Sequence, residues 1–169
     1  NAPGARVMGL TLEGKMAYLT KFQLQAGVTL QQSHYSEPHV WNPDAPAVKK
    51  MMRTPNTYGY FTATYTPIKP LSIALSGTYT GSMLVPHEPV PGFLENPITV
   101  NTKDFFDIGL KAAYDFKLYK SMNLQVNAGI QNIFNAYQND FDKGADRDSG
   151  YIYGPSLPRS FFAGVKISY

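Results

Sequence analysis

The sequence predicts an all-β chain that forms a segment of an antiparallel transmembrane β-barrel, with about seven strands. Apolar and polar residues alternate with a period of two in seven segments, which is the periodicity of side chains along a β-strand. Short turns and long connections alternate between these segments. Outer-membrane barrels have this arrangement, with short turns on the periplasmic side and long loops outside the cell.

The composition supports strands and argues against several other classes. Of the 169 residues, 14% are aromatic and only 16% are charged, and aromatic residues favour strands. No run of about 18 apolar residues occurs, so no transmembrane helix is predicted. The chain has no Cys, which leaves neither disulfides nor a cysteine-ligated metal site.

The charge and the polar residues suggest no chemistry of their own. The net charge of +3 is modest, and no basic block is interleaved with aromatic residues, so nucleic acid is not expected as a partner. No Ser/His/Asp or Cys/His arrangement is suggested either. We therefore expect no catalytic residues, no enzyme activity, no cofactor and no bound metal.

The first two strands are expected at residues 6–18 and 22–32, with a short turn between them. Each has an apolar face and a polar face. The apolar faces comprise Met8, Leu10, Leu12, Met16 and Tyr18 in the first strand, and Phe22, Leu24, Ala26, Val28 and Leu30 in the second.

The third and fourth strands are expected at residues 57–65 and 71–79, after a long segment at 33–56 that contains several prolines. Pro67 and Pro70 mark a tight turn between the two strands, because proline fixes φ and donates no hydrogen bond to a ladder.

The last three strands are expected at residues 106–116, 122–131 and 160–169. A second proline-rich segment, 81–103, precedes them, and a third long segment, 135–159, precedes the closing strand. Each of the seven strands has about 10 residues, which is enough to cross a bilayer at a tilt.

A soluble all-β sandwich also has strands with period two, so that alternative stays open. Long connections of roughly 20 residues are, however, unusual in compact soluble domains. The polar faces also carry full charges, which a water-filled lumen solvates and a dry core does not. These charges are Glu13, Lys15, Asp107, Lys111, Asp115 and Lys166.

Aromatic residues gather near both ends of the strands, as they do at the two interfaces of a bilayer. The expected periplasmic belt is Tyr18, Phe22, Tyr65, Phe116, Tyr119 and Tyr169. The expected outer belt is Tyr58, Tyr60, Tyr79, Phe105, Phe106, Phe134 and Phe161.

An odd number of strands has a topological consequence. If the closing strand ends in the periplasm, Asn1 lies outside the cell, whereas bacterial single-chain barrels have an even number of strands. Either one strand is hidden in a long segment or the chain is the C-terminal part of a larger barrel. The long segments are too rich in proline to supply that strand easily.

Four stretches carry a family resemblance: RTPNTYGYFTATYTP at 53–67, GTYTG at 77–81, GIQNIFN at 129–135 and GPSLPRSFFAGVKISY at 154–169. In this order they resemble the C-terminal barrel region of TonB-dependent outer-membrane receptors. Gly164, Ile167 and Tyr169 resemble the signal read by the barrel-assembly machinery, although Phe162 stands where that signal usually has a polar residue.

The resemblance implies a barrel of 22 strands closed by an N-terminal plug domain, in the bacterial outer membrane. Residues 1–169 would supply the last seven strands and the last three outer loops, without the plug. The implied function is part of a TonB-dependent transporter for active uptake of a nutrient: a metal chelate, haem, cobalamin or a glycan. The implied partners are outer-membrane lipid, a surface lipoprotein, and the TonB complex through an N-terminal region that this chain lacks. The alternative is a small complete barrel that acts as a structural anchor or adhesin.

Residues near the outer strand ends are candidates for ligand contact, because imidazoles bind metals and aromatic faces stack on macrocycles. The alternative without a ligand is that they are solvated loop residues and part of the outer aromatic belt. The candidates are His34, Tyr35, His39, Trp41 and His87.

Two sets of charged residues lie in the long segments, one acidic and one basic. The acidic run at 139–150 looks like a calcium loop, but its glycine spacing is wrong and no closing Glu follows. We expect its carboxylates to pair instead with Lys143 and Arg147. Lys49, Lys50 and Arg53 are expected near the outer leaflet, where they pair with lipid phosphates or lie in a solvated loop.

Overall fold

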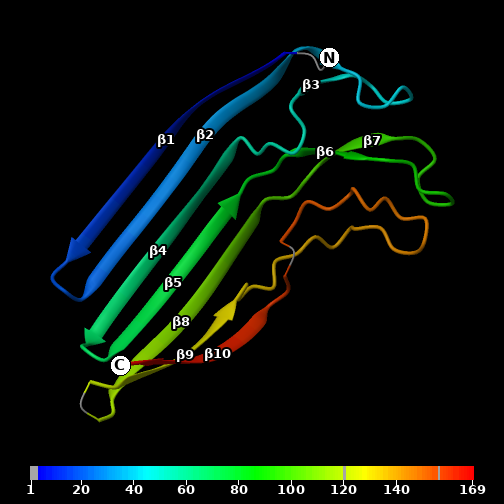
Figure 1. Cartoon of the computed structure of the whole chain (residues 1–169). Helices are drawn as coiled ribbons and strands as arrows, with labels where there is room; N and C mark the ends of the chain where they lie inside the picture. Colours follow the sequence, from blue (N-terminus) through cyan, green and yellow to red (C-terminus); the bar gives the residue numbers. More distant parts are fainter. Residues whose placement is uncertain (1–3, 120, 156) are drawn as a thin grey trace.

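The computed structural model describes residues 4–119, 121–155 and 157–169. All the regular secondary structure in this part of the chain is β-strand (Figure 1). No described helix is long and apolar enough to cross a membrane. The strands are β1 (Ala5–Tyr18), β2 (Phe22–His39), β3 (Val48–Lys50), β4 (Thr57–Ile68), β5 (Leu71–Thr80), β6 (Leu84–His87), β7 (Ile98–Asn101), β8 (Phe105–Lys117), β9 (Asn123–Gln131) and β10 (Ser160–Ser168).

Seven long strands form one antiparallel sheet in the order β1-β2-β4-β5-β8-β9-β10. They are the seven predicted strands, each paired with its neighbour along the chain. β3 pairs with the end of β2 on the side where β4 pairs farther along the strand, and β6 and β7 form a separate hairpin. In Figure 1 the short turns lie at one end of the sheet and the long connections at the other, as predicted. We call these the turn end and the loop end.

The register aligns the apolar faces of all seven strands on one side of the sheet. Directly opposed residues point to the same face, and a slip of one residue would turn a strand over. One row crosses the whole sheet through Met16, Leu24, Ala63, Leu75, Leu110, Ile130 and Phe161. The charged residues expected to face a lumen fall on the opposite side.

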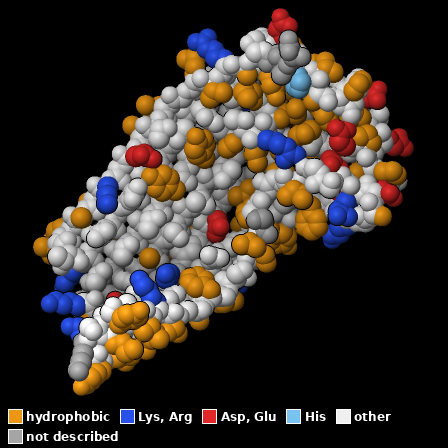
Figure 2. All heavy atoms as spheres, viewed as in Figure 1, with side chains coloured by type: hydrophobic (Ala, Val, Ile, Leu, Met, Phe, Trp, Pro, Cys, Tyr) orange, Lys and Arg blue, Asp and Glu red, His pale blue; other side chains and the backbone are white. Residues whose placement is uncertain are grey.

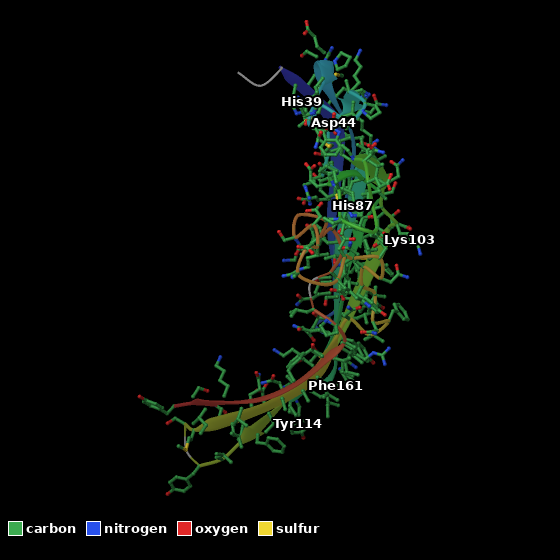
Figure 3. The ribbon with its side chains drawn as sticks, turned by 90° about the vertical axis from the view of Figure 1, so that its right-hand side faces the viewer. His39, Asp44, His87, Lys103, Tyr114 and Phe161 are labelled. Carbon is green, nitrogen blue, oxygen red and sulfur yellow. The ribbon has the colours of Figure 1, made fainter. Side chains whose placement is uncertain are left out.

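The sheet is curved, with Tyr114 and Phe161 of the apolar face on its convex side (Figure 3). The concave face, seen in Figure 2, shows mainly uncharged polar side chains and backbone over the strands. The apolar face is uncovered: Leu12 is 61% exposed and Val165 is 66% exposed. A sandwich would bury this face under a second layer, and the described residues provide none.

The long connections contain more structure than the sequence suggested. β2 continues to His39, beyond the predicted end at 32, because β1 and β3 pair with its extension. Hydrophobic alternation cannot mark this extension, since it is polar on both faces. The hairpin of β6 and β7 was not expected in a proline-rich segment. Pro86 is tolerated there opposite Thr99, because a two-stranded ribbon leaves each strand one unpaired edge.

The predicted outer aromatic belt is partly wrong. Tyr58, Tyr60 and Phe105 lie on the polar face by register, where Tyr60 donates a hydrogen bond to Glu13 over 3.1 Å. Both faces of β4 carry aromatic residues, so period two alone does not decide which of them face outward.

Some sequence predictions fall on residues that the structure does not describe. The placement of Asn1 is one, and Lys120 and Ser156 also lie outside the described residues. Gly4, the first described residue, is at the loop end, where its carbonyl accepts from the Ser36 N–H at 2.7 Å.

Candidate functional site

The three long connections meet at the loop end and are tied together by Arg53. Its backbone N–H donates to the Leu84 carbonyl at the start of β6, over 2.7 Å. Its guanidinium donates to the carbonyls of Gly150 and Ile152 in the last connection. Arg53 has a positive φ of 56°, an uncommon conformation for a residue other than glycine. One residue thus links the first, second and third connections.

His87, at the end of β6, is the second link between connections. Only 5% of it is exposed. Its Nε2 lies 2.9 Å from an Asp142 carboxylate oxygen, and its ring stacks on Tyr151 with centroids 3.8 Å apart and planes within 5°. A buried imidazole between a carboxylate and an aromatic ring is held in one orientation. The hairpin therefore docks onto the last connection at a fixed point.

Asp140 accepts hydrogen bonds from two tyrosines of the same connection, Tyr153 at 2.5 Å and Tyr151 at 3.0 Å. Burial alone would raise the pKa of Asp140, but the hydrogen bonds from Tyr153 and Tyr151 outweigh it and lower that pKa. Burial, together with the Asp140 carboxylate, raises the pKa of Tyr151 to about 12 and also raises that of Tyr153. Both phenols are therefore hydrogen-bond donors throughout the physiological range of pH.

Further hydrogen bonds hold the last connection in shape. Buried Gln138 donates to the Tyr151 carbonyl over 3.0 Å and accepts from the Tyr153 N–H over 2.9 Å. Asp148 accepts from the backbone N–H of Glu88 over 2.9 Å. Glu88 in turn accepts from the Asn42 side chain over 2.7 Å. The three connections thus form one network of hydrogen bonds.

The network encloses two clefts that open to solvent. One of about 520 Å³ lies between Phe93, in the β6–β7 hairpin loop, and residues 139–146 of the last connection. Another of about 630 Å³ lies within the last connection and includes Phe141, Arg147 and Tyr151 in its lining. Apolar surface with a few charged groups is typical of small-molecule sites.

The last connection also covers part of the concave face. Pro155 and Leu157 line a cleft of about 400 Å³ together with Thr78 and Asp107 of the polar face, and Phe105 contacts Tyr153 with centroids 6.0 Å apart. The connection therefore lies over the mouth of the curved wall, on the side where a lumen would be.

The structure separates the five ligand candidates into different places. Tyr35 and His39 are together, with ring centroids 4.7 Å apart, whereas His34 points to the opposite face of β2. Trp41 is half-buried, and its Nε1 has no hydrogen-bond partner among the described residues. His87 is in the network described above and lies below His39 in the view of Figure 3. A ligand role for these residues stays a prediction.

One prediction about charged residues is wrong. In the described part of the chain the acidic run does not pair with Lys143 and Arg147: Arg147 donates to the Gly144 carbonyl over 2.9 Å, and Lys143 lies over the Phe141 ring. Asp140, Asp142 and Asp148 accept from tyrosines, His87 and backbone N–H groups instead. The two alternatives for Lys49, Lys50 and Arg53 stay open, although the guanidinium of Arg53 is bonded to carbonyls of the last connection. Within the described residues no group of three or more His, Cys, Asp or Glu is arranged to hold a metal ion.

Sequence reasoning missed the tyrosines that organise the last connection. The spacing of Tyr151 and Tyr153 after an acidic run was a usable signal, since phenols and carboxylates pair readily. No local pattern joins His87 to Asp142, which is 55 positions away.

At the closing strand, the predicted assembly signal occupies the edge of the sheet. The Gly164 carbonyl accepts from the Asn127 side chain at 3.1 Å. Ile167 is on the apolar face and is 60% exposed, and Tyr169 is 99% exposed. The role of these three residues as an assembly signal stays a prediction.

Comparison with known proteins gives a fold. No protein-family model matches the chain, and no curated protein matches it. Among solved structures, the chain is similar to the ferric-catecholate import receptor Fiu from E. coli K12 in its closed form. The TM-score is 0.65 at 22% identity, covering 95% of this chain and 20% of the receptor. The chain therefore has the fold of a portion of that receptor, and it spans about a fifth of its length.

Proposed function

We propose that this chain is the C-terminal part of the barrel of a TonB-dependent transporter in the bacterial outer membrane. The observation that carries the proposal is the apolar face, which is continuous in register over seven strands and is left uncovered on the convex side. A surface of this extent needs an apolar solvent. The likeness to a receptor over 95% of the chain supports the same conclusion.

The dimensions agree with a bilayer. From Met8 to Met16 the apolar face of β1 extends over eight residues, about 26 Å along the strand at about 3.3 Å each. At a tilt of about 40° this is about 20 Å along the membrane normal, against an apolar band of about 25 Å in such barrels. If the other strands have the same length and tilt, the seven strands form one section of the barrel wall. The remaining strands of a 22-stranded barrel, which this chain does not contain, would complete the cylinder.

In this proposal the loop end faces outward and captures a nutrient, and a plug domain outside this chain couples its uptake to TonB. The clefts among the connections and the part of the last connection over the concave face would then supply binding surface at the entrance. The similar receptor imports ferric catecholates by its name, so a ferric chelate is the first substrate to test, followed by haem, cobalamin and glycans.

Single-cysteine labelling of the full-length protein in cells tests the orientation, and the chain itself contains no Cys. A membrane-impermeant maleimide should label Ser149→Cys, in the last connection, on intact cells. Lys69→Cys, in the turn between β4 and β5, should react only after the outer membrane is permeabilised. Labelling of Lys69→Cys alone on intact cells would contradict the proposal.

Uptake by a strain that lacks the gene tests the transport function. Accumulation of iron supplied as a ferric catecholate should fall relative to the parent strain, and a protonophore should abolish the difference, because TonB-coupled uptake needs energy. The other nutrients are tested in parallel. If labelling is as expected and no uptake depends on the gene, the alternative of an anchor or adhesin is favoured.

A further inference from the structure

Three basic side chains form one row across the first strands of the sheet. Arg6 of β1 is directly opposite His34 of β2, and His34 is directly opposite Lys50 of β3. Side chains at opposed positions point to the same face and lie about 4.5–5.5 Å apart at their Cβ atoms. Lys50 of β3 thus adds a third basic side chain beside the opposed pair of Arg6 and His34.

The row lies on the apolar, convex face. Along β1 and β2 the next pairs on this face are Met8 opposite Gln32 and then Leu10 opposite Leu30, and Leu10 and Leu30 are more than half exposed. Lys49 alternates to the other face of β3, because successive residues of a strand point to opposite sides. The basic row therefore directly follows the apolar surface at its loop end.

Within the described residues the row has no counter-charge. The one ion pair there joins His87 to Asp142, and the side chains of Arg6, His34 and Lys50 make no hydrogen bond or ring contact with other described residues. Arg6 and Lys50 flank His34 from its two sides, so two like charges lie on one face about 10 Å apart. An anion from outside the chain would offset their repulsion.

The height of the row corresponds to the headgroup level of a bilayer. Arg6 lies twelve positions before Tyr18, the aromatic residue at the turn end of β1. At about 3.3 Å per residue and a tilt of about 40°, the two are separated by about 30 Å along the membrane normal, slightly more than an apolar band of about 25 Å. If the turn-end aromatic residues are at one interface, Arg6 is just beyond the other.

We propose that Arg6, His34 and Lys50 bind the phosphate groups of a phosphorylated lipid in the outer leaflet. Arg6 presents a fork of donors that matches phosphate oxygens, and Lys50 adds a point charge. His34 adds a ring N–H donor between them. Acyl chains of the same lipid would cover Leu10 and Leu30 below the row. The site rests on the membrane placement proposed above.

The test is lipid retention by the full-length protein, purified in detergent and measured by native mass spectrometry. The probes are a phosphorylated lipid A, the same lipid after removal of its phosphates, and inorganic phosphate. The wild type should retain the phosphorylated lipid selectively. The double variant Arg6→Gln/Lys50→Gln should retain about thirtyfold less, since each of the two basic groups near a charged membrane surface contributes about 1 kcal/mol.

Lys49→Gln is the matched control, because it removes the same charge one residue from Lys50 on the opposite face. It should retain lipid as the wild type does. Equal losses in Lys49→Gln and the double variant would overturn the site, as would equal retention of the dephosphorylated lipid or equally strong binding of inorganic phosphate. Cysteine labelling of the same variants tests orientation separately. If orientation is as proposed and no variant changes retention, the lipid site is wrong and the proposed function stands.

Discussion

At the scale of single residues, burial and the Asp140 carboxylate together suppress the ionisation of two tyrosines in the last connection. A phenol whose pKa is raised in the folded state stabilises that state below pH 10, and this contribution is lost as the pH rises through the folded pKa, about 12 for Tyr151. The connection should therefore loosen above pH 10. Asp140, whose pKa is lowered, stabilises the folded state above pH 4 and loses this effect in acid.

The first prediction follows from that pairing. In Asp140→Asn the pKa of Tyr151 should fall from about 12 towards its ordinary value, although burial should keep it somewhat raised. Tyrosinate absorbance during an alkaline titration, compared with the wild type, should show additional phenol ionising at lower pH. Asp146→Asn is the control, since Asp146 lies exposed in the same acidic run. A titration of Asp140→Asn that overlays the wild type would show that the carboxylate has no such influence.

At the scale of strands, aromatic rings cover glycines on neighbouring strands at three directly opposed pairs. Tyr60 covers Gly27, Phe61 covers Gly77 and Phe162 covers Gly129. In each pair a Cβ on the glycine would overlap the ring. A ring that fits only over a glycine favours one register of its strand pair.

Gly77→Val should therefore destabilise the wall, because the added side chain displaces Phe61. Overpacking of this kind costs about 1–3 kcal/mol. The measurement is the urea dependence of the folded, fast-migrating gel band of the full-length protein in lipid vesicles. Gly14→Val is the control, because no atom lies within 4 Å of the position of its Cβ. Equal midpoints for the two variants would refute the role of the ring.

At the scale of the whole molecule, Arg53 bonds to both other connections at the loop end. Arg53→Gln should loosen the last connection, which His87 and Glu88 still hold. A non-specific protease added to intact cells should then cut residues 139–150 several times faster. Arg147→Gln is the control, because Arg147 bonds only to Gly144 in its own connection. If both variants are cut at the wild-type rate, the link through Arg53 does not hold the connections together.

The wall itself was predictable from sequence, whereas the network above it was not. Period two and the proline-rich segments between strands located all seven long strands, because in the proposed placement lipid on one side and water on the other impose an alternation that is visible locally. Beyond that wall no such contrast separates the two faces of a strand, so the extension of β2 to His39 and the β6–β7 hairpin left no such pattern. The pairing of His87 with Asp142, and of Arg53 with Gly150, depends on how separate connections fold over one another.

The pairing of every long strand with its neighbour along the chain has a kinetic consequence. No long strand must wait for a distant partner, because each pairs with the neighbouring long strand along the chain. The wall therefore consists of hairpins that share strands, and each new strand closes only the connection before it. The cost in chain entropy grows with the length of that connection. The longest closure within the sheet is that between β9 and β10, across the last connection. Ordering of that connection by Gln138, Asp140 and Tyr151 would then set the time at which the closing strand joins the wall.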